Sequence, residues 1–307
     1  MSRGADPAGG PPAIAVLGAD GQVGHALVRA LAPLGTVAAL GRAACDLARP
    51  DAAASVVRVA GPRVVVNAAA YTAVDRAEDD AEACSVVNAD APRAIAAACA
   101  DVGAAFVHFS TDYVFDGHKG APYTEEDAPA PLNVYGCTKW AGERAVASAT
   151  DAYAVFRTSW VYDPRRGHNF VRTIRRLAAE RPEVEVVDDQ RGAPTYAVLL
   201  AAAVAQVIGA ALRAPDGPAA WLAERAGTYH LAATGDTSWY EFAEAVLAAD
   251  AGANRAPRAR VQPVPSAARA GRATRPANSG LDSSRAAAVF GVRLPHWREQ
   301  LRLALDA

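Results

Sequence analysis

Three glycines at a spacing of three residues constrain the fold of this chain more than any other feature. Gly18, Gly21 and Gly24 follow the apolar run 13–17, and a helical pattern of apolar residues then continues to about Leu34. This order predicts a strand, a tight turn and a helix, in which the glycines let the backbone approach a pyrophosphate at the positive end of the helix dipole. A turn that only packs a helix on a strand would have the same pattern, so the interpretation depends on the rest of the chain.

Apolar segments of strand length alternate with helical patterns from residue 13 onward. Such alternation predicts an α/β fold with a doubly wound parallel sheet of the Rossmann type. The predicted strands cover 13–17, 37–40, 63–66, 105–110, 152–157, 184–187 and 228–232. The predicted helices cover the stretch after the glycines to about 34, then 90–102, 135–148, 170–180, 198–212 and 239–249, and a last one begins at 297.

The domain organisation follows from this order. Residues 1–12 are rich in glycine, proline and alanine and have no apolar signal core, so we expect a disordered tail there. Residues 13–157, with returning segments at about 196–234, are expected to form a dinucleotide-binding domain. The pattern becomes irregular in 158–195 and 235–307, which we expect to form a smaller C-terminal substrate-binding domain over the crevice.

Charge and cysteine usage exclude several classes of partner. The 307 residues carry a formal net charge of −2, and no apolar run approaches the ~20 residues of a membrane span, so neither nucleic acid nor membrane is an expected partner. The four cysteines, at 45, 84, 99 and 137, are scattered without a paired spacing or a histidine cluster. Neither a zinc site nor a disulfide framework is predicted, and reduced thiols fit a cytoplasmic protein.

A tyrosine and a lysine four residues apart form the candidate acid/base pair. Tyr135 and Lys139 lie in the run YGCTK, and helical spacing stacks both side chains on one face. A cation beside a phenol lowers the phenol pKa from about 10, so that it can exchange a proton with a carbonyl oxygen. A surface pair would have the same spacing. Lysine occurs only at 119 and 139 among 31 basic residues, which favours a specific need for an ammonium at 139.

Two loops at the carboxyl ends of predicted strands are expected to line the ligand crevice. NAAAYTAVD at 67–75 follows one buried strand, and STDYVFDG at 110–117 follows the next. Small side chains at 68–70 would let a cofactor lie close. The hydroxyl of Thr111 can supply a second hydrogen bond beside the tyrosine.

The end of the second predicted strand bears on cofactor preference. An NAD site commonly has an acidic residue there, whereas this chain has Gly41 and Arg42. An arginine can pair with a 2′-phosphate, which favours NADPH, although a solvated surface arginine would look the same in sequence.

A run from 254 to 281 contains six arginines and no acidic residue. Such a run is commonly a solvated loop, but arginines that face a crevice can bind a diphosphate through forked hydrogen bonds. Arg275 is the candidate substrate contact among them. The arginines stand at 255, 258, 260, 269, 272 and 275.

Taken together, the motifs resemble the extended short-chain dehydrogenase/reductases, and within them the family of dTDP-4-dehydrorhamnose reductases. The match extends from residue 13 to about 300, and its motifs stand in the order of the family. Any one motif is weak, whereas the set is specific. The motifs are GADGQVG at 18–24, NAAAYTAVDRAE at 67–78, STDYVFDG at 110–117, PLNVYGCTK at 131–139, RTSWVY at 157–162, NF at 169–170 and DQRGAPT at 189–195.

The resemblance implies a role for each matched residue. Thr111 would hold the C4 carbonyl oxygen of a keto-sugar, Tyr135 would protonate it, and Lys139 would lower the tyrosine pKa and hold the nicotinamide ribose. Hydride would come from NADPH, with NADH as a possible substitute. The expected cofactor contacts are Gly18, Gly21, Gln22, Val23, Gly24, Arg42, Asp46, Leu47, Ala70, Tyr71, Thr72, Tyr135 and Lys139. The expected substrate contacts are Val74, Thr111, Asp112, Trp160 and Arg275.

The resemblance leaves the product and the non-catalytic alternative open. The implied reaction is NADPH-dependent reduction of the C4 ketone of dTDP-4-dehydro-β-L-rhamnose to dTDP-β-L-rhamnose. A nucleotide-sugar 4-ketoreductase of an antibiotic-sugar pathway would have the same chemistry. A non-catalytic, NADP-binding regulatory subunit, similar to the beta subunit of methionine adenosyltransferase, is the non-enzymatic alternative.

The resemblance also bears on metal and assembly. Some family members pair through magnesium held by two glutamates, at positions that are Ala26 and Val198 here. Neither side chain offers an oxygen ligand, so no metal is expected. We therefore expect a monomer or a metal-independent homodimer.

Overall fold

Six parallel strands form the central sheet of the computed structural model, which describes residues 13–252, 259–269 and 271–306. Their order is β2-β1-β3-β4-β5-β10, so the chain moves outward from β1 to β2 and then returns to the other side of β1. Doubly wound sheets bind ligands at such a reversal, beyond the carboxyl ends of the strands. The predicted fold class is confirmed. The strands are β1 (Ile14–Leu17), β2 (Val37–Leu40), β3 (Val64–Asn67), β4 (Ala105–Thr111), β5 (Tyr153–Thr158) and β10 (Gly227–His230).

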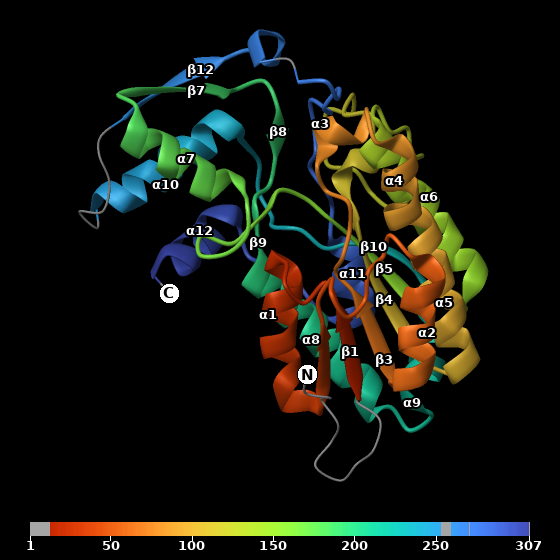
Figure 1. Cartoon of the computed structure of the whole chain (residues 1–307). Helices are drawn as coiled ribbons and strands as arrows, with labels where there is room; N and C mark the ends of the chain where they lie inside the picture. The colour runs from red at the N-terminus through yellow and green to blue at the C-terminus, as the bar shows by residue number, and fades with distance from the viewer. Residues whose placement is uncertain (1–12, 253–258, 270, 307) are drawn as a thin grey trace.

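Helices cover both faces of this sheet (Figure 1). Every residue of β1, β3 and β4 is buried, which explains why these strands are almost continuously apolar. The helices on one face are α1 (Gln22–Leu31), α8 (Ala197–Arg213), α9 (Gly217–Ala223) and α11 (Ser284–Phe290). Those on the other face are α2 (Pro50–Ala60), α5 (Ala91–Val102) and α6 (Val134–Ala149).

Several of these helices lie where the sequence did not predict them. α9 and α11 have only seven residues each, and α2, although longer, is one of several alanine-rich stretches in a chain rich in alanine. α11 lies in the range 235–307 that we assigned to the substrate domain, yet it packs against β10, and its Ala286 is fully buried in the core beneath the sheet. The chain therefore returns once more to the dinucleotide-binding part.

A π-helical turn, Val86–Asp90, joins α4 (Ala81–Ser85) to α5 and follows the short helix α3 (Val74–Ala77). We predicted this helix only from about 90, so the prediction missed its first part. The turn places Asn88 in a fully interior position, next to the loop that follows β3. Single π-helical turns are frequent at functional sites.

A smaller lobe stands to one side of the sheet, at the upper left of Figure 1. Its core contains buried aromatic side chains, among them Phe242 and Trp297. Its helices are α7 (Phe170–Glu180), α10 (Trp239–Gly252) and α12 (Trp297–Asp306). Its two-stranded ladders pair β7 (Glu183–Val187) with β12 (Arg260–Val264), β8 (Arg191–Gly192) with β11 (Thr237–Ser238), and β6 (Val161–Tyr162) with β9 (Thr195–Tyr196).

Two predictions concern residues at the limits of the described chain. The tail 1–12 and the arginines at 255 and 258 lie outside the described residues.

In the part that is described, no single helix is long and apolar enough to cross a membrane, and α8 with α9 meets that test only as a pair bent by 112°. Nine residues of α8 are buried, because it packs against α1 and α9 on one face of the sheet.

Candidate active site

The glycine-rich turn lies against the loop that follows β3. Gly18 has a φ of +75°, and a Cβ atom there would come within 2.7 Å of the Ala69 nitrogen. A Cβ atom on Gly24 would meet the Gly18 carbonyl oxygen. Only glycine therefore lets the two segments approach this closely. No side chain caps the start of α1 at Gly21, so its first amides and its positive dipole end are free for an anion.

The predicted cofactor residues after this turn have mixed surroundings. The side chain of Gln22 is already bonded to the smaller lobe, because its Oε1 accepts from Asp163 N at 2.9 Å and from Asn169 Nδ2 at 2.7 Å. Asp46 Oδ1 accepts from the amide of residue 48 at 3.1 Å, and Leu47 is buried. These contacts fix the backbone around the start of α1 and the loop after β2.

At the end of β2, an acidic side chain from another segment lies where the sequence indicated only an arginine. Arg42 is exposed, as a 2′-phosphate contact requires. The carboxylate of Asp20 fills the space that a side chain at Gly41 would occupy. One positive and one negative side chain therefore stand near the expected 2′ position, and sequence spacing indicated only the first.

Asn88 holds the loop after β3 in place. Its Oδ1 accepts from Tyr71 N at 2.9 Å, and its Nδ2 donates to Tyr71 O at 3.1 Å. The Tyr71 hydroxyl in turn donates to Asp80 at 3.0 Å. The main chain at 70–72, which the resemblance assigned to the cofactor, is thus fixed by a residue that sequence reasoning missed. The signal was an asparagine inside an apolar helical run.

The carboxyl end of β4 carries Thr111 and Asp112, both buried. Thr111 Oγ1 donates to Asp112 Oδ1 at 2.9 Å and accepts from Tyr113 N at 3.2 Å. Burial raises the pKa of Asp112 to about 6, and hydrogen bonds from the side chains of Ser279 and Thr111 oppose this shift. The hydroxyl of Ser110 is buried without a hydrogen-bond partner in the described chain, so it can bond to a ligand group.

Tyr135 stands on the first turn of α6, which begins where Asn133 caps it. Asn133 Oδ1 accepts from Gly136 N at 2.8 Å, and its Nδ2 donates to Thr274 O at 2.8 Å. A Cβ atom on Gly136 would meet the Tyr113 carbonyl oxygen, so glycine lets α6 lie against the end of β4. Burial raises the pKa of Tyr135 above its ordinary value, and a hydrogen bond with the Thr111 side chain opposes this.

Lys139 does not make the contact that the sequence predicted. We expected its ammonium to sit against the phenol of Tyr135. Instead Lys139 is buried, and its Nζ lies 2.6 Å from Phe109 O and 3.2 Å from His108 Nε2. The physical reason is that a buried amine takes the nearest acceptor groups, and β4 supplies them. Sequence spacing on α6 contained no information about β4.

A cavity of about 580 Å³ opens beside this site, between the two lobes. It does not include Tyr135 itself, but it includes Tyr113, whose ring lies edge-on to the ring of Tyr135 at 5.7 Å between centroids. The ring of Tyr113 therefore lies between Tyr135 and the cavity. Its lining residues include Asp75, Tyr113, Phe170, Gln190, Trp239, Thr274 and Arg275.

Of the predicted substrate residues, Arg275 lines this cavity, and Trp160 stacks on the lining residue Trp239. Arg275 is bonded to Asp75 through two nitrogens, at 2.6 and 3.2 Å. Trp160 stacks on Trp239 at 3.5 Å between ring centroids, with a φ of +47°, a strained value for a bulky residue. A Cβ atom on Gly192 would come within 2.7 Å of the Trp160 ring, so glycine makes room for the stack.

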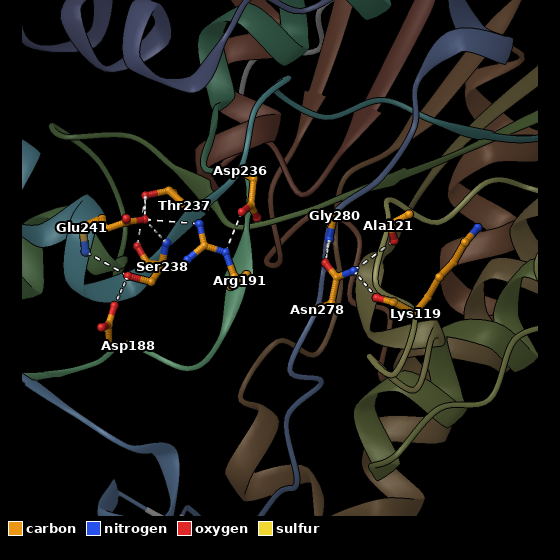
Figure 2. A network of polar contacts seen from close by, with 10 residues as sticks. All are labelled: Lys119, Ala121, Asp188, Arg191, Asp236, Thr237, Ser238, Glu241, Asn278 and Gly280. Atoms are coloured by element: carbon orange, nitrogen blue, oxygen red, sulfur yellow. Dashed lines mark hydrogen bonds and ion pairs between the residues drawn. The ribbon is translucent and has the colours of Figure 1, made fainter.

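A segment of residues 277–282, which we call the clasp, ties the lobes together (Figure 2). Asn278 Nδ2 donates to the carbonyls of Lys119 and Ala121 at 2.6 and 3.0 Å. On the other side the backbone of Arg191 bonds to residues 277 and 279, and its guanidinium pairs with Asp236. Because the clasp directly follows Arg275, it fixes that wall of the cavity.

Three other residues named in the sequence analysis do not line the cavity: Arg272, Val74 and Cys137. Arg272 is exposed and pairs with Asp79, so this arginine of the run faces an acid from another segment. Val74 starts α3 and is half-buried, next to the cavity residue Asp75. Cys137 is exposed on the side of α6 away from the core, as a bystander would be.

A doubly wound sheet with an uncapped glycine turn and a Thr, Tyr and Lys set at its carboxyl edge defines an extended short-chain dehydrogenase/reductase. The chain belongs to the RmlD substrate binding domain family, whose model matches residues 13–307. It is 47% identical over 295 residues to a dTDP-4-dehydrorhamnose reductase of Burkholderia thailandensis, with 95% of this chain and 97% of the relative covered. It is 44% identical to the Escherichia coli protein of that name, at 95% and 97% coverage.

Solved structures agree with these relatives. A dTDP-4-dehydrorhamnose reductase of Bacillus anthracis, crystallised in complex with NADP, superposes with a TM-score of 0.84 at 34% identity, covering 95% of this chain and 98% of that one. A protein of the same name from Clostridium acetobutylicum gives a TM-score of 0.86 at 33% identity, with the same coverage. The UDP-glucose 4-epimerase of Thermus thermophilus, at 22% identity, shares the fold with a TM-score of 0.74.

Proposed function

We propose that this chain is an NADPH-dependent oxidoreductase that reduces the C4 ketone of dTDP-4-dehydro-β-L-rhamnose to give dTDP-β-L-rhamnose. The observation that carries the proposal is the hydrogen bond between the side chains of Thr111, at the end of β4, and Tyr135, on the first turn of α6, with Lys139 one turn further along the same helix. Relatives that carry this activity in their names cover nearly the whole chain, which supports the substrate class.

The surroundings of the glycine turn fit a dinucleotide. Glycine at 18 and 24 lets the turn fold closely on itself and on Ala69, and the first amides of α1 carry no side-chain cap, so a pyrophosphate can bind there. The loop at 70–72 and Lys139 would hold the nicotinamide half, and Arg42 the 2′-phosphate. When bound, the reduced nicotinamide supplies the hydride.

Tyr135 acts as the proton donor to the carbonyl oxygen in this proposal. Because burial raises its pKa, the phenol keeps its proton at neutral pH until negative charge develops on the substrate oxygen. Thr111 offers the second hydrogen bond to that oxygen, which requires its hydroxyl to turn from Asp112. A charged Lys139 then stabilises the phenolate that remains.

Product analysis tests this proposal. The purified protein is incubated with NADPH and dTDP-4-dehydro-β-L-rhamnose, loss of NADPH is followed by absorbance, and the sugar product is identified by NMR. We expect dTDP-β-L-rhamnose. The C4 epimer would instead assign the chain to another deoxysugar pathway, and cofactor binding without turnover would support the regulatory-subunit alternative.

A further inference from the structure

Behind Tyr135, three polar side chains from three elements form a buried hydrogen-bonded chain. Asn67 ends β3, His108 lies in β4, and Lys139 lies in α6; their exposures are 0%, 0% and 2%. Asn67 Nδ2 is 3.1 Å from His108 Nδ1, and His108 Nε2 is 3.2 Å from Lys139 Nζ. Neither Asn67 nor His108 has a role in the predicted chemistry, so their burial next to the lysine needs an account.

The direction of donation along this chain follows from its first member. Asn67 Oδ1 accepts from the Ala69 amide at 3.0 Å, and a backbone N–H can only donate. The amide oxygen of Asn67 therefore faces Ala69, and its Nδ2 faces the ring. Because that NH₂ group donates to His108 Nδ1, the proton of the neutral ring must sit on Nε2.

This tautomer determines which form of the lysine fits. His108 Nε2–H points at Lys139 Nζ, and only a neutral amine has a lone pair to accept it. The same amine donates one of its own protons to Phe109 O at 2.6 Å. An ammonium would bring two donors face to face, so it can form only after Nζ moves from His108 or the ring turns.

We propose that Asn67 and His108 together hold Lys139 as a neutral amine in the cofactor-free protein at alkaline pH, and that cofactor binding charges it. On binding, Nζ leaves His108 and takes one proton from solvent, which converts the amine into an ammonium without any other change in bonding. His108 is thus a positioning residue that acts through Lys139. The second half of this proposal rests on the proposed function, since a lysine that supports a phenolate must be charged.

The charged and titratable groups around Lys139 are consistent with this form. Glu143, one turn along α6, favours the ammonium, but it is engaged with Arg157 of β5 at 2.6 and 2.9 Å. Cys84 of α4 faces the lysine as an uncharged thiol, because burial raises its pKa. Burial lowers the pKa of Lys139 to about 8. Burial and the lysine lower the pKa of His108 well below its ordinary value, so the ring is neutral.

The composition of the chain makes the first test direct. Only two lysines are present, so lysine labelled with ¹³C and ¹⁵N gives two side-chain signals, and Lys119→Arg assigns them. At pH 9 without cofactor, we expect the Lys139 signal of a neutral amine. Proton–nitrogen spectra of the six labelled histidines should show His108 as the Nε2–H tautomer. An ammonium at pH 9, or the Nδ1–H tautomer, would overturn the proposal in the unmodified protein.

Two substitutions test the cause. In Asn67→Asp the new carboxylate still accepts from the Ala69 amide, but toward the ring it can only accept, so the proton of His108 moves to Nδ1. His108 Nε2 then accepts a hydrogen bond from Lys139 as an ammonium. His108→Phe removes the donor and keeps a flat ring beside Phe106. We expect each variant to raise the Lys139 pKa by about one unit or more.

The double variant, Asn67→Asp with His108→Phe, separates tautomer inversion from simple charge. If the introduced carboxylate acts only through its negative charge, its effect persists when the histidine is replaced; if it acts through the ring, most of the effect disappears. If the effect of Asn67→Asp persists in the double variant, the proposal that Asn67 acts on Lys139 through the His108 tautomer is overturned. The pH profile of kcat/KM should move in the same direction as the lysine pKa, which a purely structural role would not produce.

Proton uptake on binding tests the second half. Calorimetric titration with NADP⁺ in buffers of different ionisation enthalpy counts protons. We expect uptake of about one proton near pH 9 and little near pH 6.5, with the Kd rising up to about tenfold per pH unit above pH 8. Absence of uptake at pH 9 with normal binding would reject the coupling. Failure to bind NADP⁺ at all would reject the proposed function and leave the NMR result standing.

Discussion

The two walls of the site are built in different ways. The first wall, where Thr111 and Tyr135 lie beside Tyr113, consists of a buried strand end and the first turn of a helix, fixed by main-chain hydrogen bonds and a side-chain cap. The second wall, which contains Arg275 and the Trp160–Trp239 stack, is held by ring stacking and an ion pair between segments far apart in the chain.

This difference separates two tasks. Proton transfer requires reacting groups to be held within a fraction of an ångström, which regular and buried elements provide. Binding of a large nucleotide tolerates side chains that adjust. We therefore expect damage to the first wall to lower kcat and damage to the second to raise KM.

The largest effect is expected from Tyr135→Phe, which removes the proposed proton donor and leaves the ring in place. We expect turnover to fall roughly 10²-fold or more, with cofactor binding retained. Stopped-flow kinetics and fluorescence titration with NADPH measure the two quantities. Tyr113→Phe is the matched control on the same wall and should lose less than about tenfold. Unchanged turnover in Tyr135→Phe would remove it from the mechanism.

A smaller effect is expected from Arg275→Ala. Loss of a charge-assisted contact costs about 1.5–3 kcal/mol, so KM for the nucleotide sugar should rise roughly 10- to 100-fold with kcat nearly unchanged. Asp75→Asn distinguishes binding from a merely structural pair, because it frees the arginine and should not raise KM. Arg272→Ala, at an exposed pair with Asp79, is the control. Equal damage from the Arg275 and Asp75 variants would make the pair structural.

Cofactor preference should respond to two residues with opposite signs. Arg42→Ala should reduce the ratio of kcat/KM for NADPH over NADH toward unity, because a solvated contact to the 2′-phosphate is lost. Asp20→Asn should increase the ratio by removing a nearby negative charge. Steady-state kinetics with both cofactors measure this. If neither ratio moves, Arg42 is a surface residue only.

The smallest effect is expected from metal removal. Among the described residues no group of three or more His, Cys, Asp or Glu side chains is placed to hold a metal ion. Ala26 is buried at the α1–α8 contact, and Val198 is 41% exposed. EDTA should change neither activity nor the mass from gel filtration. A dimer that dissociates on chelation would show that ligands other than those two positions hold a metal.

The first wall was predictable because its signals are local. The glycine turn, the apolar strand ends and the Tyr–Lys spacing each lie within a few residues, and sequence order then specifies the sheet. The hydrogen-bond partners of Lys139 could not be predicted from the sequence. Contacts from β4 to α6 join residues 30 and 31 positions apart, and no helical spacing encodes them.

The second wall was less predictable because its contacts are long-range. Arg275 and its partner Asp75 are 200 positions apart, and Trp160 stacks on Trp239 from a different segment of the chain. The arginine run contains no acidic residue, so the sequence could not show that two of its arginines form ion pairs with Asp75 and Asp79. The π-helical turn at Asn88 was missed because helical periodicity does not mark an inserted residue.

The stack of Trp160 on Trp239 also gives this protein an optical signal. Two indoles at 3.5 Å with an interplanar angle of 9° couple their electronic transitions, and one ring precedes β6 while the other begins α10. Any ligand that separates or realigns them changes near-ultraviolet circular dichroism and tryptophan emission. Because Trp239 lines the cavity, the stacked pair can report ligand binding there by its own absorption and emission. No attached dye is needed.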